Sequence, residues 1–123
     1  MEDRFLDQLS GGQRQRAYVA MILAQDTEYI LLDEPLNNLD IARSLQMMDH
    51  LRLAADNFGK TILLVMHDIN IAAKYSDRIC IMKDGKIGAF GSPKEIMKKE
   101  ILSELFETNI EVIEGPYGPL AVY

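Results

Sequence analysis

The feature that most restricts the fold is a short, continuously apolar run, Tyr29–Leu32, which ends in two adjacent carboxylates, Asp33 and Glu34. A run of this kind is typical of a strand buried on both faces of a parallel sheet. A second apolar run, Thr61–Met66, ends at His67. Because the carboxyl ends of parallel strands open onto the same crevice, we expect His67 to lie near the two carboxylates. The sequence therefore predicts an α/β fold with a polar site at one edge of the sheet.

A glycine pair lies about twenty residues upstream of the carboxylates, in the sequence Leu9-Ser10-Gly11-Gly12-Gln13. Glycine has no Cβ, so an anion can approach its N–H group closely, and the serine adds a hydroxyl donor. A helix predicted after the glycines directs its positive dipole end to the same place. A bare Gly-Gly fits a simple turn before a helix equally well. The neighbouring carboxylates favour a phosphate site.

These motifs resemble the nucleotide-binding domain of ATP-binding cassette (ABC) transporters. Residues 9–13 match the signature motif of that family, and residues 30–34 are similar to its Walker B strand with the catalytic glutamate. Asn37-Asn38-Leu39-Asp40 lies where the D-loop belongs, and His67 matches the switch histidine. The resemblance covers nearly all of the chain. The D-loop and the C-terminal tail are most similar to the ATPases of iron-chelate (siderophore) importers.

The resemblance implies that two complete ATPase subunits bind ATP and Mg²⁺ head to tail. Asp40 would link the two sites across the interface, and it can also be the N-cap of the next helix. The signature residues would contact the γ-phosphate of ATP held by the opposite subunit. These residues are Ser10, Gly11, Gly12 and Gln13.

The remaining site residues would act on nucleotide held by the same subunit. By the resemblance, Asp33 would hold Mg²⁺, mostly through water, and Glu34 would position and polarise the attacking water as a general base. His67 would stabilise the γ-phosphate. The implied activity is the hydrolysis of ATP, which drives uptake of an iron-siderophore or a similar iron chelate.

The family's phosphate-binding Walker A loop, its glutamine loop and its base-stacking aromatic lie upstream of the signature motif, and we find none of them in the sequence. Residues Ala54–Thr61 mimic a P-loop if alanine is allowed at the first position. A working P-loop follows a strand and opens a helix, whereas here a helix is predicted before the segment and a strand after it. Gly59 is better explained as a helix C-cap. We therefore expect the carboxyl-terminal half of an ABC ATPase, inactive by itself.

The fold expected from this resemblance is a partial P-loop NTPase (RecA-like) α/β fold in three layers. Its mostly parallel sheet would lack the Walker A strand and be followed by a C-terminal hairpin. One partial domain, residues 1–123, would contain a signature helix (10–25), a Walker B, D-loop and H-loop core (29–91) and C-terminal helices with the hairpin (92–123). The missing strand would leave the Thr61–Met66 and Ile79–Met82 runs with unpaired edges, so we expect self-association.

Turn and cap signals predict the remaining elements. Asp84-Gly85 is typical of a hairpin turn, and Ser92 with Glu95 has the spacing of a capping box at a helix start. Residues 110–113 and 120–123 predict a terminal hairpin with a wide loop, and Cys80 is expected to be a buried thiol in a buried strand. A long helix is predicted to end at Gly59, with a core face of Ile41, Leu45, Met48, Leu51, Ala55 and Phe58.

Composition restricts the partners. The 123 residues are 48% hydrophobic, as in a soluble globular domain. A single cysteine fits a reducing cytoplasm. Because the sequence shows neither a signal peptide nor a bilayer-length apolar run, contact with the inner face of the membrane is expected through permease subunits. Contact with an iron-chelate-binding protein would be indirect.

Two other interpretations stay open. The same motifs would fit an ATPase of the DNA-repair and chromosome-maintenance branch. The formal net charge of -6 argues against it, because a nucleic-acid surface needs a clustered basic patch. A non-catalytic half-domain that binds and modulates an intact ATPase would also carry these motifs. DNA-stimulated hydrolysis would support the former, and co-purification with a full-length subunit the latter.

Overall fold

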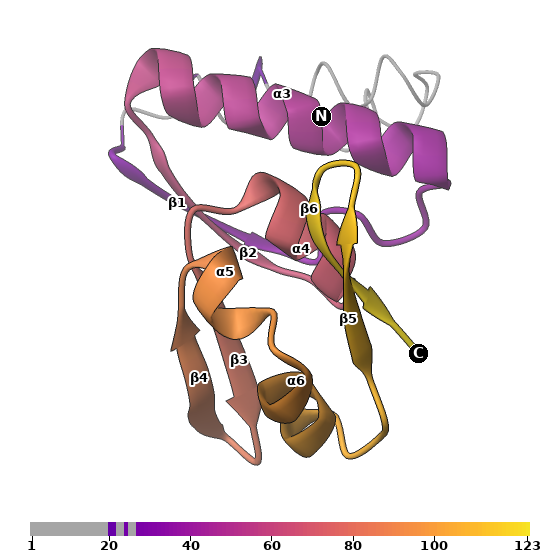
Figure 1. Ribbon diagram of the computed structural model, residues 1–123. Coiled ribbons are helices and arrows are strands. Elements are labelled where there is room, and N and C mark those ends of the chain that lie inside the picture. The colour runs from indigo at the N-terminus through magenta and orange to yellow at the C-terminus, as the bar shows by residue number, and fades with distance from the viewer. Residues whose placement is uncertain (1–19, 22–23, 25–26) are drawn as a thin grey trace. The chain divides into compact units, whose positions relative to one another are not determined.

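The computed structural model describes residues 20–21, 24 and 27–123 (Figure 1). The chain divides into two compact units, Met1–Met66 and His67–Tyr123. The predicted signature helix lies mostly outside the described residues, although Ala20, Met21 and Ala24 are helical. Among the described residues, none of the helices combines the length and the apolar character that crossing a bilayer requires.

In the first unit, strand β1 (Tyr29–Asp33) pairs with strand β2 (Thr61–Val65), and helix α3 (Ile41–Phe58) connects them. The two strands are parallel and in register from Tyr29 opposite Thr61 to Asp33 opposite Val65. The parallel pairing predicted from the two apolar runs is confirmed. Backbone hydrogen bonds extend the ladder at both ends, from Thr61 N–H to the Glu28 carbonyl (2.9 Å) and from Glu34 N–H to the Val65 carbonyl (3.0 Å).

The prediction that β1 is buried on both faces is wrong for the described structure. Ile30 and Leu32 are buried, whereas Tyr29 is 71% exposed and Leu31 is 70% exposed. Successive side chains of a strand point to opposite faces, so one face of β1 is covered and the other is open. An unbroken apolar run shows that both faces can be buried, but it does not show what covers each face.

Both ends of α3 follow their predicted signals. The Asp40 carboxylate accepts a hydrogen bond from the Arg43 N–H, and Gly59 adopts a left-handed conformation with φ 63°. Residues 54–61 therefore form a helix end, a cap and a strand start, the reverse of the order that a P-loop needs.

The buried face of α3 differs from the one predicted. Met48 and Leu51 belong to both sets, but Ile41 and Phe58 are exposed. Apolar residues occur around much of this helix, so hydrophobic spacing alone does not single out one stripe. The buried residues of α3 are Ser44, Met47, Met48, Leu51 and Ala54.

The second unit contains three helices and two hairpins. The helices are α4 (Ile69–Tyr75), α5 (Pro93–Ile96) and α6 (Lys99–Leu105). The hairpins are β3 (Ile79–Lys83) with β4 (Lys86–Gly91), and β5 (Glu111–Gly115) with β6 (Gly118–Val122).

The described strands form three two-stranded sheets, of which β1–β2 is parallel and the other two are antiparallel. One mostly parallel sheet, as predicted, is thus not what the described residues form. The reason is that β3 and β5 are each followed by a tight turn, which allows only an antiparallel return. Neither β2 nor β3 has a second partner strand within residues 27–123.

The β3–β4 turn is the one predicted. Asp84 and Gly85 both have positive φ, 52° and 74°, as a two-residue hairpin turn requires. The expected burial of Cys80 is wrong: Ile79 and Ile81 are buried, and Cys80 lies on the exposed face of β3 between them. Strand alternation decides this outcome.

The C-terminal part follows its local signals, with one correction. Ser92 and Glu95 form the predicted capping box at the start of α5. The terminal hairpin is present, but its loop is not wide, because Gly115 pairs with Gly118 and only Pro116 and Tyr117 lie between them. Gly118 has φ 120°, a conformation that glycine alone adopts easily, so the turn closes early.

Candidate functional site

Glu34 sits in an unusual backbone conformation directly after β1. Its φ is 51°, in the left-handed region, and its N–H donates a 3.0 Å hydrogen bond to the Val65 carbonyl at the end of β2. A non-glycine residue held in this region costs about 1–3 kcal/mol, which the surrounding contacts must offset. The sheet therefore fixes the backbone from which the Glu34 side chain extends. Asp33, one residue earlier, is the last residue of β1 and pairs with Val65.

Two consecutive turns join Glu34 to α3. The Asn37 N–H donates to the Glu34 carbonyl and the Leu39 N–H donates to the Leu36 carbonyl, both at 3.1 Å. The next residue, Asp40, accepts a 2.8 Å hydrogen bond from the Arg43 N–H. These backbone hydrogen bonds hold the loop between Glu34 and α3 in one conformation, and so they fix the position of Asp40 relative to Glu34. The N-cap role predicted for Asp40 is confirmed.

His67 is an exposed residue at the start of the second unit, directly before Asp68, the N-cap of α4. Asp68 accepts hydrogen bonds from the N–H groups of Asn70 (2.9 Å) and Ile71 (3.1 Å). His67 is thus attached to the capped end of a helix. Its predicted closeness to Glu34 concerns both units and stays a prediction.

The structure joins Asp33, Glu34 and Asp40 in one continuous segment. The other predicted site residues are Ser10, Gly11, Gly12 and Gln13, which lie outside the described residues. Their phosphate-binding role stays a prediction.

Asp33 fits the ligand chemistry of Mg²⁺. Its carboxylate is exposed at the carboxyl end of β1. Protein Mg²⁺ sites use one or two carboxylates and complete an octahedron with water and phosphate oxygens. Within the described part of the chain, no three His, Cys, Asp or Glu side chains gather as a ready ligand set.

Sequence reasoning missed two features near these residues. One is the Asp68 cap, whose signal was present, since an aspartate directly before an apolar helix start is a common N-cap. The other is Asn70, whose side chain bonds to Ala121, 51 residues away. No local pattern could have found that contact.

Comparison with known proteins points to one family. The model of the ABC transporter family matches residues 1–37, a range that includes the signature motif and both carboxylates. Over 100% of its length, the chain is 71% identical to the petrobactin import ATP-binding protein FatE of Bacillus anthracis. The chain is a relative of the ATP-binding proteins of ABC transporters. It spans about half, 49%, of the length of FatE.

Solved ABC structures confirm the fold. A putative metal-chelate type ABC transporter in an inward-facing conformation superposes with a TM-score of 0.82 and 26% identity, over 96% of this chain and 50% of that chain. A dimeric ATP-binding cassette in a post-hydrolysis state, bound to ADP and Pi, gives a TM-score of 0.58 and 38% identity. That match covers 71% of this chain and 37% of the cassette. The chain thus has part of the P-loop NTPase fold of ABC ATPases.

Proposed function

We propose that this chain forms part of the ATP-hydrolysing subunit of an ABC importer that takes up an iron-siderophore or a similar iron chelate. The observation that carries the proposal is the 71% identity to FatE over the full length of this chain. The match to a metal-chelate type transporter at a TM-score of 0.82 supports the same class of cargo. The ATPase activity belongs to the complete subunit, of which this chain supplies the Walker B, D-loop and signature portions.

In this proposal, bound Mg²⁺ and ATP supply the electrophilic phosphorus and the charge neutralisation that phosphoryl transfer needs. Asp33 would hold the metal. Glu34 takes the proton of the attacking water as general base, and the backbone bond to Val65 fixes where its side chain starts. His67 donates a hydrogen bond to the terminal phosphate.

The signature residues act on the partner subunit's nucleotide. Ser10 and the amides of Gly11 and Gly12 donate to the γ-phosphate, with Gln13 at the following helix start. Asp40 contacts the opposite subunit beside its capping role. The dimeric state of the ADP- and Pi-bound cassette that this chain resembles supports a pair of subunits, and we propose that they lie head to tail. Permease subunits at the inner membrane face would complete the transporter, with an iron-chelate-binding protein as an indirect partner.

A chimera tests this proposal. The matching segment of FatE is replaced by the 123 residues of this chain, and ATP hydrolysis is measured for the purified subunit and for the assembled importer. We expect activity close to that of FatE. Glu34→Gln should lower kcat about 100-fold or more, the usual effect of removing a general base. An exposed carboxylate on α3, Asp49→Asn, is the control and should leave kcat unchanged. An inactive chimera beside active FatE, or full activity of Glu34→Gln, would disprove the proposal.

The chain alone gives a complementary measurement. We expect calorimetric titration of MgATP into the 123-residue chain to show no binding, because the helix-then-strand order of residues 54–61 does not cradle phosphate. Tight binding would mean that this segment, or an oligomer, builds a phosphate site after all.

A further inference from the structure

The side chain of Asn70 makes a two-point contact with the backbone of Ala121. Its Nδ2 donates to the Ala121 carbonyl at 3.1 Å, and its Oδ1 accepts from the Ala121 N–H at 2.8 Å. Asn70 lies in the first turn of α4 and Ala121 lies on β6, and Figure 1 shows this helix beside that strand. The amide side chain of Asn70 thus pairs with both the N–H and the carbonyl of Ala121.

Burial makes this contact necessary. Ala121 is 5% exposed and lies opposite Val112 of β5. In an antiparallel ladder, the backbone groups of alternate residues point away from the partner strand. Those of Ala121 point toward α4, where Asn70 takes the place of a third strand. Without Asn70 a buried donor and a buried acceptor would lose their partners.

Asn70 is held at its backbone as well. Its N–H donates to Asp68 Oδ1 at 2.9 Å, and Asp68 follows His67 directly. The hydrogen-bonded path from β6 to the residue beside His67 therefore runs through one side chain and one helix cap. A shift of Asn70 would move the cap and, with it, the backbone from which His67 extends.

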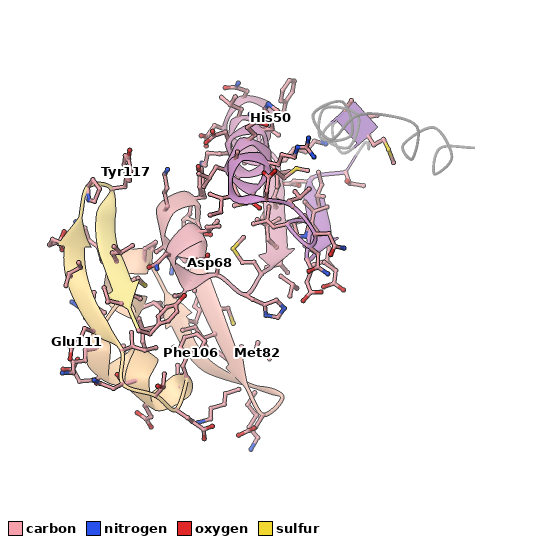
Figure 2. All side chains as sticks on the ribbon, turned by 90° about the vertical axis from the view of Figure 1, so that its right-hand side faces the viewer. His50, Asp68, Met82, Phe106, Glu111 and Tyr117 are labelled. Carbon is pink, nitrogen blue, oxygen red and sulfur yellow. The ribbon has the colours of Figure 1, made fainter. Side chains whose placement is uncertain are left out.

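A second contact fixes the other end of α4. The Lys74 ammonium, in the last turn, lies 4.4 Å from the centre of the Tyr117 ring. Figure 2 shows Tyr117 at the turn of the β5–β6 hairpin and Asp68 at the start of α4. The two contacts lie one turn apart on the same face of α4, so together they set the direction of this short helix. The Lys74 contact is the weaker one, because Tyr117 is 78% exposed.

The hairpin itself is anchored elsewhere, on α6. The Ser103 hydroxyl accepts from the Ile110 N–H (3.0 Å) and donates to the Ile110 carbonyl (3.2 Å). Lys99 pairs with Glu111 at 2.8 Å. The position of the hairpin is therefore fixed by α6 and does not depend on the Asn70 contact with α4.

We propose that Asn70 is a positioning residue: by bonding to Ala121 it fixes the start of α4 against the C-terminal hairpin and so sets the orientation of His67. The catalytic consequence rests on the proposed function, in which His67 contacts the terminal phosphate. The structural consequence does not, and it can be measured without nucleotide.

Nuclear magnetic resonance of the 123-residue chain tests the structural step. The chain has two histidines, so the imidazole signal of His67 can be followed with His50, in the other unit, as an internal reference. Asn70→Ala should shift and broaden the His67 signal and leave His50 unchanged. Exchange of the amide hydrogens at the start of α4 should become about tenfold faster, the effect of about one lost hydrogen bond. Asn70→Asp, which keeps the acceptor for the Ala121 N–H, should restore part of the His67 signal.

Ser103→Ala is the matched control, because it removes an equivalent two-point contact at the base of the same hairpin. It should speed exchange at Ile110 without moving His67. An unchanged His67 signal in a folded Asn70→Ala chain, or an equal shift in Ser103→Ala, would overturn the proposal. If Asn70→Ala does not fold, Asn70→Asp, which loses only the hydrogen bond to the Ala121 carbonyl, serves instead. A smaller His67 shift in the same direction is then expected, and no shift would overturn the proposal.

The catalytic step is measured in the FatE chimera. Asn70→Ala should lower kcat about tenfold or more, as expected when a catalytic group is misplaced, and should leave the KM for ATP unchanged. Unchanged kcat would overturn the catalytic consequence. A chimera without any ATPase activity would disprove the proposed function. The magnetic resonance experiment alone would then test whether Asn70 sets the orientation of His67.

Discussion

The two units hold their polar groups in opposite ways. In the first unit, Asp33, Glu34 and Asp40 lie in one continuous segment, and backbone hydrogen bonds to neighbouring residues and to Val65 hold it. In the second unit, side chains join positions far apart in the sequence, as Asn70 does with Ala121. The comparison suggests that the carboxylates depend on the local path of the chain, whereas His67 depends on the packing of a whole unit.

The largest difference between the units should appear on truncating a leucine. Leu102 on α6 is completely buried, with 0% exposure, whereas Leu31 on β1 is 70% exposed. Leu102→Ala should lower the free energy of unfolding by about 2–5 kcal/mol, because it leaves a cavity. Leu31→Ala should change it by less than about 0.5 kcal/mol. Urea unfolding followed by circular dichroism measures both.

An equal cost for Leu31→Ala would have a specific meaning. It would show that the open face of β1–β2 is covered in solution, and the self-association expected from the sequence would bring a second chain to cover it. Light scattering on the same samples would decide, since a monodisperse monomer excludes a second copy.

Local signals predicted the fold well wherever one short segment determines the geometry. Asp84-Gly85 forms the β3–β4 turn, Ser92 and Glu95 form a capping box, and Gly59 ends α3. The wrong predictions concern which face of a strand is buried. Cys80 and Leu31 are exposed although both lie in apolar runs, because the environment of a face depends on what packs against it and not on the run itself.

The candidate site divides in the same way. Asp33 and Glu34 were found from the end of an apolar run, and the Asp40 cap from its place before a helix. The left-handed backbone of Glu34 was not predicted, because the bond from its N–H to the Val65 carbonyl reaches another strand. The same reason hides Asn70, whose partner is 51 residues away.

A smaller effect tests the backbone strain at Glu34. Glycine adopts φ 51° without steric cost, so Glu34→Gly should raise the free energy of unfolding by about 1 kcal/mol even though it removes a functional side chain. Glu34→Gln is the matched control, since it keeps the strained Cβ, and its stability should stay within about 0.5 kcal/mol of the parent. Thermal unfolding of the three proteins provides the comparison. If the glycine variant is no more stable than the glutamine variant, the backbone at Glu34 is not strained.

The smallest expected effect on stability concerns the start of one helix in each unit, α3 and α5. Helix α3 starts at Asp40 alone, whereas α5 starts at a box in which Glu95 also accepts from the Ser92 N–H, at 3.1 Å. That backbone hydrogen bond, with a further one from the Ser92 side chain, holds the pKa of Glu95 below its ordinary value of 4.5. A carboxyl whose pKa is lower in the folded state stabilises the fold fully above 4.5, and this contribution disappears as the pH falls through the lower, folded pKa.

The difference in unfolding free energy between the parent chain and Glu95→Gln should therefore be constant at neutral pH and shrink only below pH 4.5. It should be small throughout, because the carboxyl is exposed and solvent screens its interactions. Ser92→Ala should move the pKa of Glu95 part of the way back toward 4.5, since it removes the hydroxyl and keeps the N–H. A carbon-13 titration of the Glu95 carboxyl measures this directly. An unshifted pKa in the parent chain would mean that the box does not persist in solution, and that α5 begins no more firmly than α3.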